Sequence, residues 1–193
     1  DRRLRLMRAG DRVLDLGCRP GSWLQYALKV VGPHGAVVGI DRDALPKPIP
    51  GARVMQGDIF ATPDAELLGT LAAFDVVLSD MAPNTTGTRT TDQARSASLF
   101  EEALTRAERL LAPGGAFVGK IFMGEDFQAA KKALKAIYGE ERAIKPEGTR
   151  SSRDELVLIG LGEKARSGGG WALRRRPGRS TGDCATRLRA SRC

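Results

Sequence analysis

One stretch, residues 74–84 with the sequence FDVVLSDMAPN, constrains the fold of this chain more than any other. Val76, Val77 and Leu78 form a continuous apolar run, which is typical of a parallel strand that is buried on both faces of a sheet. In an α/β sheet, such a strand brings its last residues to the crevice at its carboxyl end, where ligands bind. Asp80 is therefore expected at this edge. Because a carboxylate is costly to bury, we expect a cation or hydrogen-bond donors to face it.

The rest of the body alternates between short apolar strands and amphipathic helices. Strands are predicted at residues 12–16, 36–40, 52–56, 74–80, 116–122 and 156–161, and helices at 22–31, 64–71, 91–111 and 124–138. This alternation predicts an α/β protein with a Rossmann-like, doubly wound, mostly parallel sheet and helices on both faces. A chain of this length is expected to form one domain, over residues 1–163.

The net charge of +8 comes from the end of the chain. Residues 164–193 contain nine basic side chains and one acidic side chain, whereas residues 1–163 contain 22 of each kind. The overall charge therefore gives no evidence that the body of the protein binds nucleic acid. The tail has few apolar residues and no periodicity, so we expect it to be disordered, either as an RNA-binding extension or without a function.

No feature of the sequence favours a membrane or secreted protein. No apolar run approaches the roughly 18 residues that cross a bilayer, and the first ten residues lack the apolar core of a signal peptide. The three cysteines and the single histidine suggest neither a disulfide framework nor a metal site. We expect a cytoplasmic monomer that binds no metal and no membrane.

Residues 15–23, DLGCRPGSW, form a glycine-containing turn between a strand and a helix. Gly17 and Gly21 allow the backbone to approach a nucleotide-like ligand, and the following helix offers free N–H groups to an anionic group. Asp41 ends the next strand, where a carboxylate can accept hydrogen bonds from both ribose hydroxyls, and Asp58 follows the third strand, where it can accept from an adenine amine. Together these residues favour an adenosine-type cofactor. The G-x-G-x-x-G fingerprint is absent, but an NAD-linked oxidoreductase also uses a strand-end carboxylate and stays an alternative.

At this point a resemblance becomes clear. The segments DLGCRPGSW, GIDRDAL, MQGDIF, SDMAPNTTGTRTTD, LAPGGAFVGKIF and TRSSRDE resemble the FtsJ (RrmJ or RlmE) family of S-adenosylmethionine-dependent ribosomal RNA 2'-O-ribose methyltransferases, over residues 4–162. The resemblance implies a class I methyltransferase fold, S-adenosylmethionine as cofactor and RNA of the large ribosomal subunit as substrate. The cofactor-binding residues that it implies are Gly17, Gly21, Trp23, Asp41, Asp58 and Asp80.

Similar enzymes use a Lys-Asp-Lys-Glu tetrad, and Asp80, Lys120 and Glu155 match three of its positions. A ribose 2'-hydroxyl attacks only when its proton is removed, and a lysine can remove it if burial or a second cation lowers its pKa from about 10.4. Lys120 stands within an apolar strand and is the expected general base. Asp80 would orient its amine beside the transferable methyl group, and Glu155 would fix the lysine and the ribose. The alternatives are a Lys120 that extends to water and a Glu155 that is a solvated charge.

Two departures from the family pattern bear on activity. The first lysine of the tetrad would precede the start of this chain, and residues 1–10 look like the end of an element, so either the chain is a fragment or the tetrad is incomplete. A non-catalytic S-adenosylmethionine-binding module therefore stays an alternative. Arg19 stands where the family usually has a small residue, and would either clasp the methionine carboxylate of the cofactor or crowd the cofactor.

Local charges are expected to bind the RNA. Lys145, Arg150 and Arg153 are predicted to lie in a loop just before Glu155, where they could hold phosphates near the reactive ribose. The 2'-hydroxyl distinguishes RNA from DNA, but transfer RNA and messenger RNA caps also carry it and stay possible substrates. On the predicted helix 91–111, Glu102 and Arg106 are four residues apart, which indicates a solvated ion pair.

Overall fold

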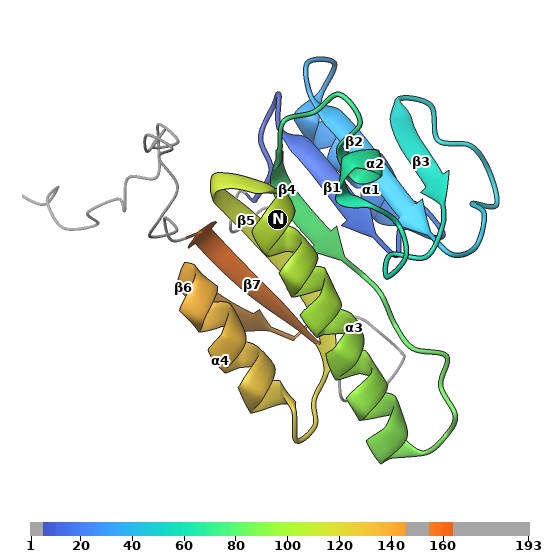
Figure 1. Cartoon of the computed structure of the whole chain (residues 1–193). Helices are drawn as coiled ribbons and strands as arrows, with labels where there is room; N and C mark the ends of the chain where they lie inside the picture. The colour runs from blue at the N-terminus through green and yellow to red at the C-terminus, as the bar shows by residue number, and fades with distance from the viewer. Residues whose placement is uncertain (1–5, 146–154, 164–193) are drawn as a thin grey trace, which may run out of the picture.

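The computed structural model describes residues 6–145 and 155–163 and shows one seven-stranded sheet in the order β3-β2-β1-β4-β5-β7-β6 (Figure 1). The strands are β1 (Arg12–Leu16), β2 (Ala36–Asp41), β3 (Ala52–Gln56), β4 (Phe74–Ser79), β5 (Leu111–Phe122), β6 (Tyr138–Ile144) and β7 (Glu155–Glu163). The helices are α1 (Ser22–Val31), α2 (Asp64–Leu68), α3 (Arg89–Leu110) and α4 (Phe127–Ile137). Strands β1 to β5 pair in parallel, and β7 is antiparallel to β5 and β6. The predicted doubly wound, mostly parallel sheet is confirmed.

The strand order reverses at the centre of the sheet. From β1 the chain proceeds outward through β2 to β3, returns to β4 on the other side of β1, and continues outward to β5. The loops that follow β1 and β4 therefore diverge from neighbouring strand ends, which is where doubly wound sheets leave a crevice for a ligand.

Apolar side chains on both faces of the sheet bind the helices to it. Helices α2, α3 and α4 cover one face, where Leu67, Phe100 and Leu134 belong to one buried cluster. Helix α1 covers the other face through Leu24 and Val31, which belong to a second cluster. Strands β1 and β4 contribute to both clusters, which agrees with the prediction of strands that are buried on both sides.

The sequence patterns did not predict β6. Only its first residue, Tyr138, is buried, and the charged residues 140–142 occupy positions that an apolar pattern would need. Among the described residues, β6 forms an edge of the sheet with no strand beyond it, so its polar side chains can reach water. The predicted tail, residues 164–193, lies outside the described residues.

Strand β5 also differs from the prediction. It begins at Leu111 rather than at Ala116, and it includes Pro113 and Gly114, which lie between the predicted helix 91–111 and the predicted strand 116–122. A shift in register opposite residues 74–76 of β4 accommodates this irregular start.

Within the part of the chain that the structure describes, none of the helices has the length and apolar character of a membrane span.

Gly119 allows α3 to approach the centre of the sheet. A Cβ atom at this position would lie 2.7 Å from Phe100 Cε2 of α3 and 2.7 Å from Phe117 Cζ. The two rings pack edge to face, with centroids 5.5 Å apart and an interplanar angle of 72°. Because aromatic rings in a packed core cannot easily yield, the absence of a side chain here is a packing requirement.

We predict that Gly119→Ala lowers the free energy of unfolding by about 1–3 kcal/mol, since the added methyl group overpacks the core. Denaturant unfolding followed by circular dichroism measures the change. Gly139→Ala in β6 is the matched control, because its new Cβ would come no closer than 3.4 Å to another heavy atom, the carbonyl oxygen of Gly162. An equal loss of stability in both variants would contradict this explanation.

Candidate active site

A cavity of about 520 Å³ opens at the carboxyl edge of the sheet. Its volume falls within the range of roughly 300–1,000 Å³ that is usual for small-molecule sites. Five of the predicted site residues lie in its wall, from the ends of five different strands: Gly17, Asp41, Asp58, Asp80 and Lys120. The structure thus brings together residues that are up to about a hundred positions apart in the sequence.

The first turn of the chain forms one wall of this cavity. The backbone N–H groups of Gly17 and Cys18 donate to the carbonyl oxygen of Ile40, at 2.9 and 3.2 Å, and hold the turn against the end of β2. Gly17 has φ +76°, and a Cβ atom there would lie 2.7 Å from Met81 Cγ. Only glycine permits this conformation together with such a close approach of the loop after β4.

Backbone groups orient the carboxylates of Asp41 and Asp58. Asp41 accepts hydrogen bonds from the N–H groups of Arg19, at 3.0 Å, and Asp43, at 2.9 Å. Asp58 accepts one from the N–H of Phe60, at 2.9 Å. Because a carboxylate has about four acceptor positions, both groups can accept further hydrogen bonds from a ligand in the cavity.

Lys120 and Asp80 form an ion pair in the cavity wall, with Nζ 2.6 Å from Oδ1. The side chain of Lys120 is 16% exposed and that of Asp80 is 33% exposed. Ser79 and Gly119 pair in register across β4 and β5, so the two charged residues follow at the same level of neighbouring strands. Lys120 therefore faces a carboxylate and does not simply extend to water.

Glu155 lies near this pair but does not join it. Antiparallel pairing aligns Phe122 with Glu155 and Lys120 with Val157. Residues that are paired in this way share a face, so Glu155 is a diagonal neighbour of Lys120, a relation that usually separates Cα atoms by about 7–8 Å. Glu155 is half-buried, which differs from a fully solvated charge. Among the described residues, no ion pair within 4.0 Å connects it to Lys120, and it does not line the cavity.

Two other predicted cofactor residues lie outside the wall of the cavity. Gly21 has φ +110°, and a Cβ atom there would collide with Ile49 Cδ1, so its close contact is with the loop after β2. Trp23 packs against the apolar cluster beneath α1. Their role in cofactor binding stays a prediction.

Of the three predicted RNA contacts, the structure describes one. Lys145 is exposed and follows β6 directly. The residue before it, Ile144, pairs with Val157 of β7, and Val157 pairs with Lys120 of β5. Lys145 therefore lies at the same edge of the sheet as Lys120, two strand spacings or about 10 Å from it. Arg150 and Arg153 lie outside the described residues.

Arg19 lies in the wall of the cavity, next to Asp41. Its guanidinium Nη1 is 3.7 Å from Asp43 Oδ2, and both side chains are more than half exposed. An exposed pair of this kind contributes little to stability, so Arg19 remains able to contact a ligand.

The sequence patterns gave no role to Asp15, although its position inside the apolar strand RVLDL was a signal. Its side chain is fully buried, and neither carboxyl oxygen has a hydrogen-bond partner among the described residues. Burial, together with the negative charges of Asp80 and Asp41, raises the pKa of Asp15 to about 8. A buried carboxyl group of this kind, close to the cavity residues Asp80 and Asp41, suits a ligand that brings positive charge to this site.

The prediction of a solvated pair on α3 is wrong for Arg106. Arg106 is buried, at 6% exposure, and its guanidinium contacts Asp64 and the loop after β3 in addition to Glu102. The spacing of four residues predicted the contact with Glu102 correctly but carried no information about the distant partners.

We predict that Asp15→Asn stabilises the protein relative to the unaltered chain by an amount that grows with pH. Because the pKa of Asp15 is 3.8 ordinarily and about 8 in the folded protein, unfolding releases a proton between these values. Through this group alone, the free energy of unfolding should fall by about 1.4 kcal/mol per pH unit over that range. Denaturant unfolding of both proteins across the range measures the difference. A difference that does not vary with pH would show that Asp15 is charged throughout.

The fold is similar to that of solved methyltransferase structures. A protein assigned as a ribosomal RNA methyltransferase from Plasmodium falciparum aligns with a TM-score of 0.74 and 27% identity, over 86% of this chain and 92% of that one. Fibrillarin from Aeropyrum pernix, with natively bound S-adenosyl-L-methionine, aligns with a TM-score of 0.54 and 17% identity, over 80% of this chain and 67% of that one. At this lower identity, the similarity concerns the fold alone.

Sequence comparisons extend this similarity. The "Ribosomal RNA large subunit methyltransferase E" of Sorangium cellulosum (strain So ce56) is 52% identical over 166 residues, which cover 86% of this chain and 78% of the relative. A family model described as FtsJ-like methyltransferase matches residues 1–163. The resemblance found in the sequence motifs is thereby confirmed, and the chain belongs to the FtsJ-like methyltransferase family.

Proposed function

We propose that this enzyme transfers the methyl group of S-adenosylmethionine to a ribose 2'-hydroxyl of RNA in the large ribosomal subunit. The observation that carries the proposal is the 2.6 Å ion pair between Lys120 and Asp80, in the wall of a cavity that also presents Asp41 and Asp58. The name of the relative from Sorangium cellulosum supports the RNA substrate.

The charge of the cavity favours this cofactor over NAD. Asp15, Asp41 and Asp80 lie close enough for the charges of the last two to raise the pKa of the first. The carboxylates of Asp41, Asp58 and Asp80 in the cavity wall attract a sulfonium and an ammonium group, whereas they would repel the pyrophosphate of NAD. When bound, S-adenosylmethionine supplies a methyl group on a sulfonium centre.

The residues of the chain that would hold the cofactor are those with oriented carboxylates. We assign Asp41 to the ribose hydroxyls and Asp58 to the exocyclic amine of the adenine, since both have acceptor capacity left. Gly17 leaves room in the first turn, and Asp80 supplies negative charge near the cationic groups. Gly21, just before α1, and Trp23, in the first turn of α1, would also contribute to the cofactor site.

Lys120 would accept the proton of the 2'-hydroxyl. A lysine acts as a base only in its neutral form, and the hydrogen bond to Asp80 would fix the direction of its amine. Glu155 shares the face of the sheet with Lys120 and would help to fix the lysine and the ribose. Alignment of the hydroxyl with the methyl group then supplies much of the rate. Lys145, with Arg150 and Arg153, would hold nearby phosphates.

We predict that Lys120→Met lowers methyl transfer to large ribosomal subunits by about 10²–10⁴-fold, the usual contribution of a general base. Binding of S-adenosylmethionine, measured by calorimetry, should persist, and NAD should not bind. Lys132→Met on α4 is the matched control, since Lys132 is exposed and does not line the cavity. Unchanged transfer by Lys120→Met would reject the assigned base. Equal or better transfer to transfer RNA or capped messenger RNA would reject the assigned substrate.

A further inference from the structure

We propose that Arg106 of α3 is a positioning residue for cofactor binding, because it holds the loop of residues 57–63 that brings Asp58 and Phe60 to the cavity. This inference deepens the proposed function and rests on it. Arg106 itself is not part of the cavity wall, so it acts through the loop.

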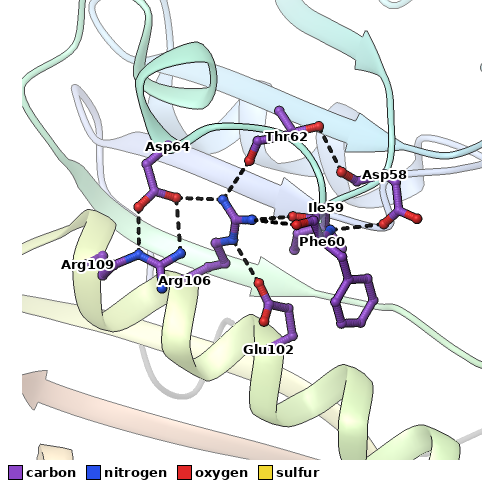
Figure 2. Close-up of polar contacts among 8 residues, drawn as sticks. All are labelled: Asp58, Ile59, Phe60, Thr62, Asp64, Glu102, Arg106 and Arg109. Carbon is purple, nitrogen blue, oxygen red and sulfur yellow. Dashed lines mark hydrogen bonds and ion pairs between the residues drawn. The ribbon is translucent and has the colours of Figure 1, made fainter.

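All five N–H donors of Arg106 have an acceptor (Figure 2). Nε donates to Glu102 Oε1 at 2.8 Å, and Nη1 donates to Asp64 Oδ1 at 2.6 Å. The remaining donors reach backbone carbonyl oxygens of the loop, at distances of 2.7 Å for Thr62, 2.5 Å for Ile59 and 3.5 Å for Phe60. A buried guanidinium thus anchors three peptide groups of one short loop.

The loop has no regular secondary structure, so its shape depends on these contacts. Its own hydrogen bonds converge on Asp58, whose carbonyl oxygen accepts from the N–H groups of Ala61, at 3.0 Å, and Thr62, at 2.8 Å. The Thr62 hydroxyl donates to the same carbonyl oxygen, at 2.8 Å. Backbone N–H groups of the loop thus donate to Asp58. Backbone carbonyl oxygens of the loop accept from Arg106, as Figure 2 shows.

This arrangement sets the positions of two cavity residues. The carboxylate of Asp58 is held by the N–H of Phe60, and the carbonyl oxygen of Phe60 in turn accepts from Arg106. The side chain of Ile59 is buried, whereas Phe60 is 54% exposed and lines the cavity. A loop that loses its anchor would let both Asp58 and Phe60 move relative to the ligand.

Lysine cannot replace arginine here. A lysine ammonium has three donors on one atom, whereas the guanidinium spreads five donors over a planar fork. After Arg106→Lys, some of the carbonyl oxygens would be buried without a partner or would have to turn toward water, and the loop would change its shape.

Arg109 provides a matched comparison. It lies one turn further along α3 and binds the same Asp64, with Nε 2.6 Å from Oδ2 and Nη2 3.2 Å from Oδ1. Its side chain is 41% exposed. Within the described part of the chain, its guanidinium donates to Asp64 and not to the carbonyl oxygens of the loop. Arg109→Lys therefore changes a contact with Asp64 on the same helix at constant charge, but leaves the anchor of the loop in place.

Arg106→Lys should raise the Kd for S-adenosylmethionine about tenfold, measured by calorimetry well below the unfolding transition, because the anchor of Asp58 is lost. The KM for the cofactor should rise with it. The kcat at saturating cofactor should stay near that of the unaltered enzyme, since Lys120 and Asp80 lie on other strands. Hydrogen exchange at the amides of Ala61 and Thr62 should become faster. Arg109→Lys should leave all of these unchanged.

Equal Kd values for the Arg106→Lys and Arg109→Lys variants would overturn the inference, as would a loss of kcat with an unchanged KM. If Arg106→Lys does not fold, Glu102→Gln loosens only the Nε contact and should raise the Kd in the same direction by a smaller factor. An unchanged Kd in that variant would also overturn it.

If the unaltered protein does not bind S-adenosylmethionine, the proposed function is rejected together with the cofactor role of Arg106. The hydrogen-exchange data would still decide whether Arg106 anchors the loop.

Discussion

The ion pair between Lys120 and Asp80 depends on the arrangement of the whole sheet. Strands β4 and β5 must be parallel neighbours, with Ser79 level with Gly119, for the two side chains to meet at 2.6 Å. The reversal of strand order between β1 and β4 opens the crevice in front of this pair. The absent side chain at Gly119 permits the close packing of α3 directly behind the lysine. The site thus follows from the topology.

Helix α3 supports the cavity along most of its length. Near its start, the carboxylate of Asp92 accepts hydrogen bonds from the N–H and hydroxyl of Thr86, at 2.8 and 2.9 Å, in the loop after β4. One turn later, Ser96 Oγ accepts from the N–H of Phe122 at the end of β5. Further on, Arg106 holds the loop after β3. One helix therefore holds the loops after β3 and β4 and the end of β5 in fixed relative positions.

Local patterns explain which features the sequence revealed. Short, mainly apolar runs predicted β1, β2 and β4. The aspartates at the strand ends placed the cavity, because the carboxyl ends of parallel strands share one edge. The charged edge strand β6 has no apolar pattern and was missed. Arg106 was misjudged because its spacing reports only on Glu102, whereas the loop carbonyl oxygens and Asp64 lie 42 to 47 residues away in the sequence. The unpartnered state of Asp15 likewise depends on neighbours from two other strands.

The chemical identity of the product tests the central claim most directly. Large ribosomal subunits would be incubated with the purified enzyme and S-adenosylmethionine that carries a labelled methyl group, and their RNA would be digested to nucleosides for mass spectrometry. We predict that the label appears in a 2'-O-methylated nucleoside, with the extra mass on the ribose fragment. Label on a base, with none on the ribose, would contradict the role that we assign to Lys120 and Asp80.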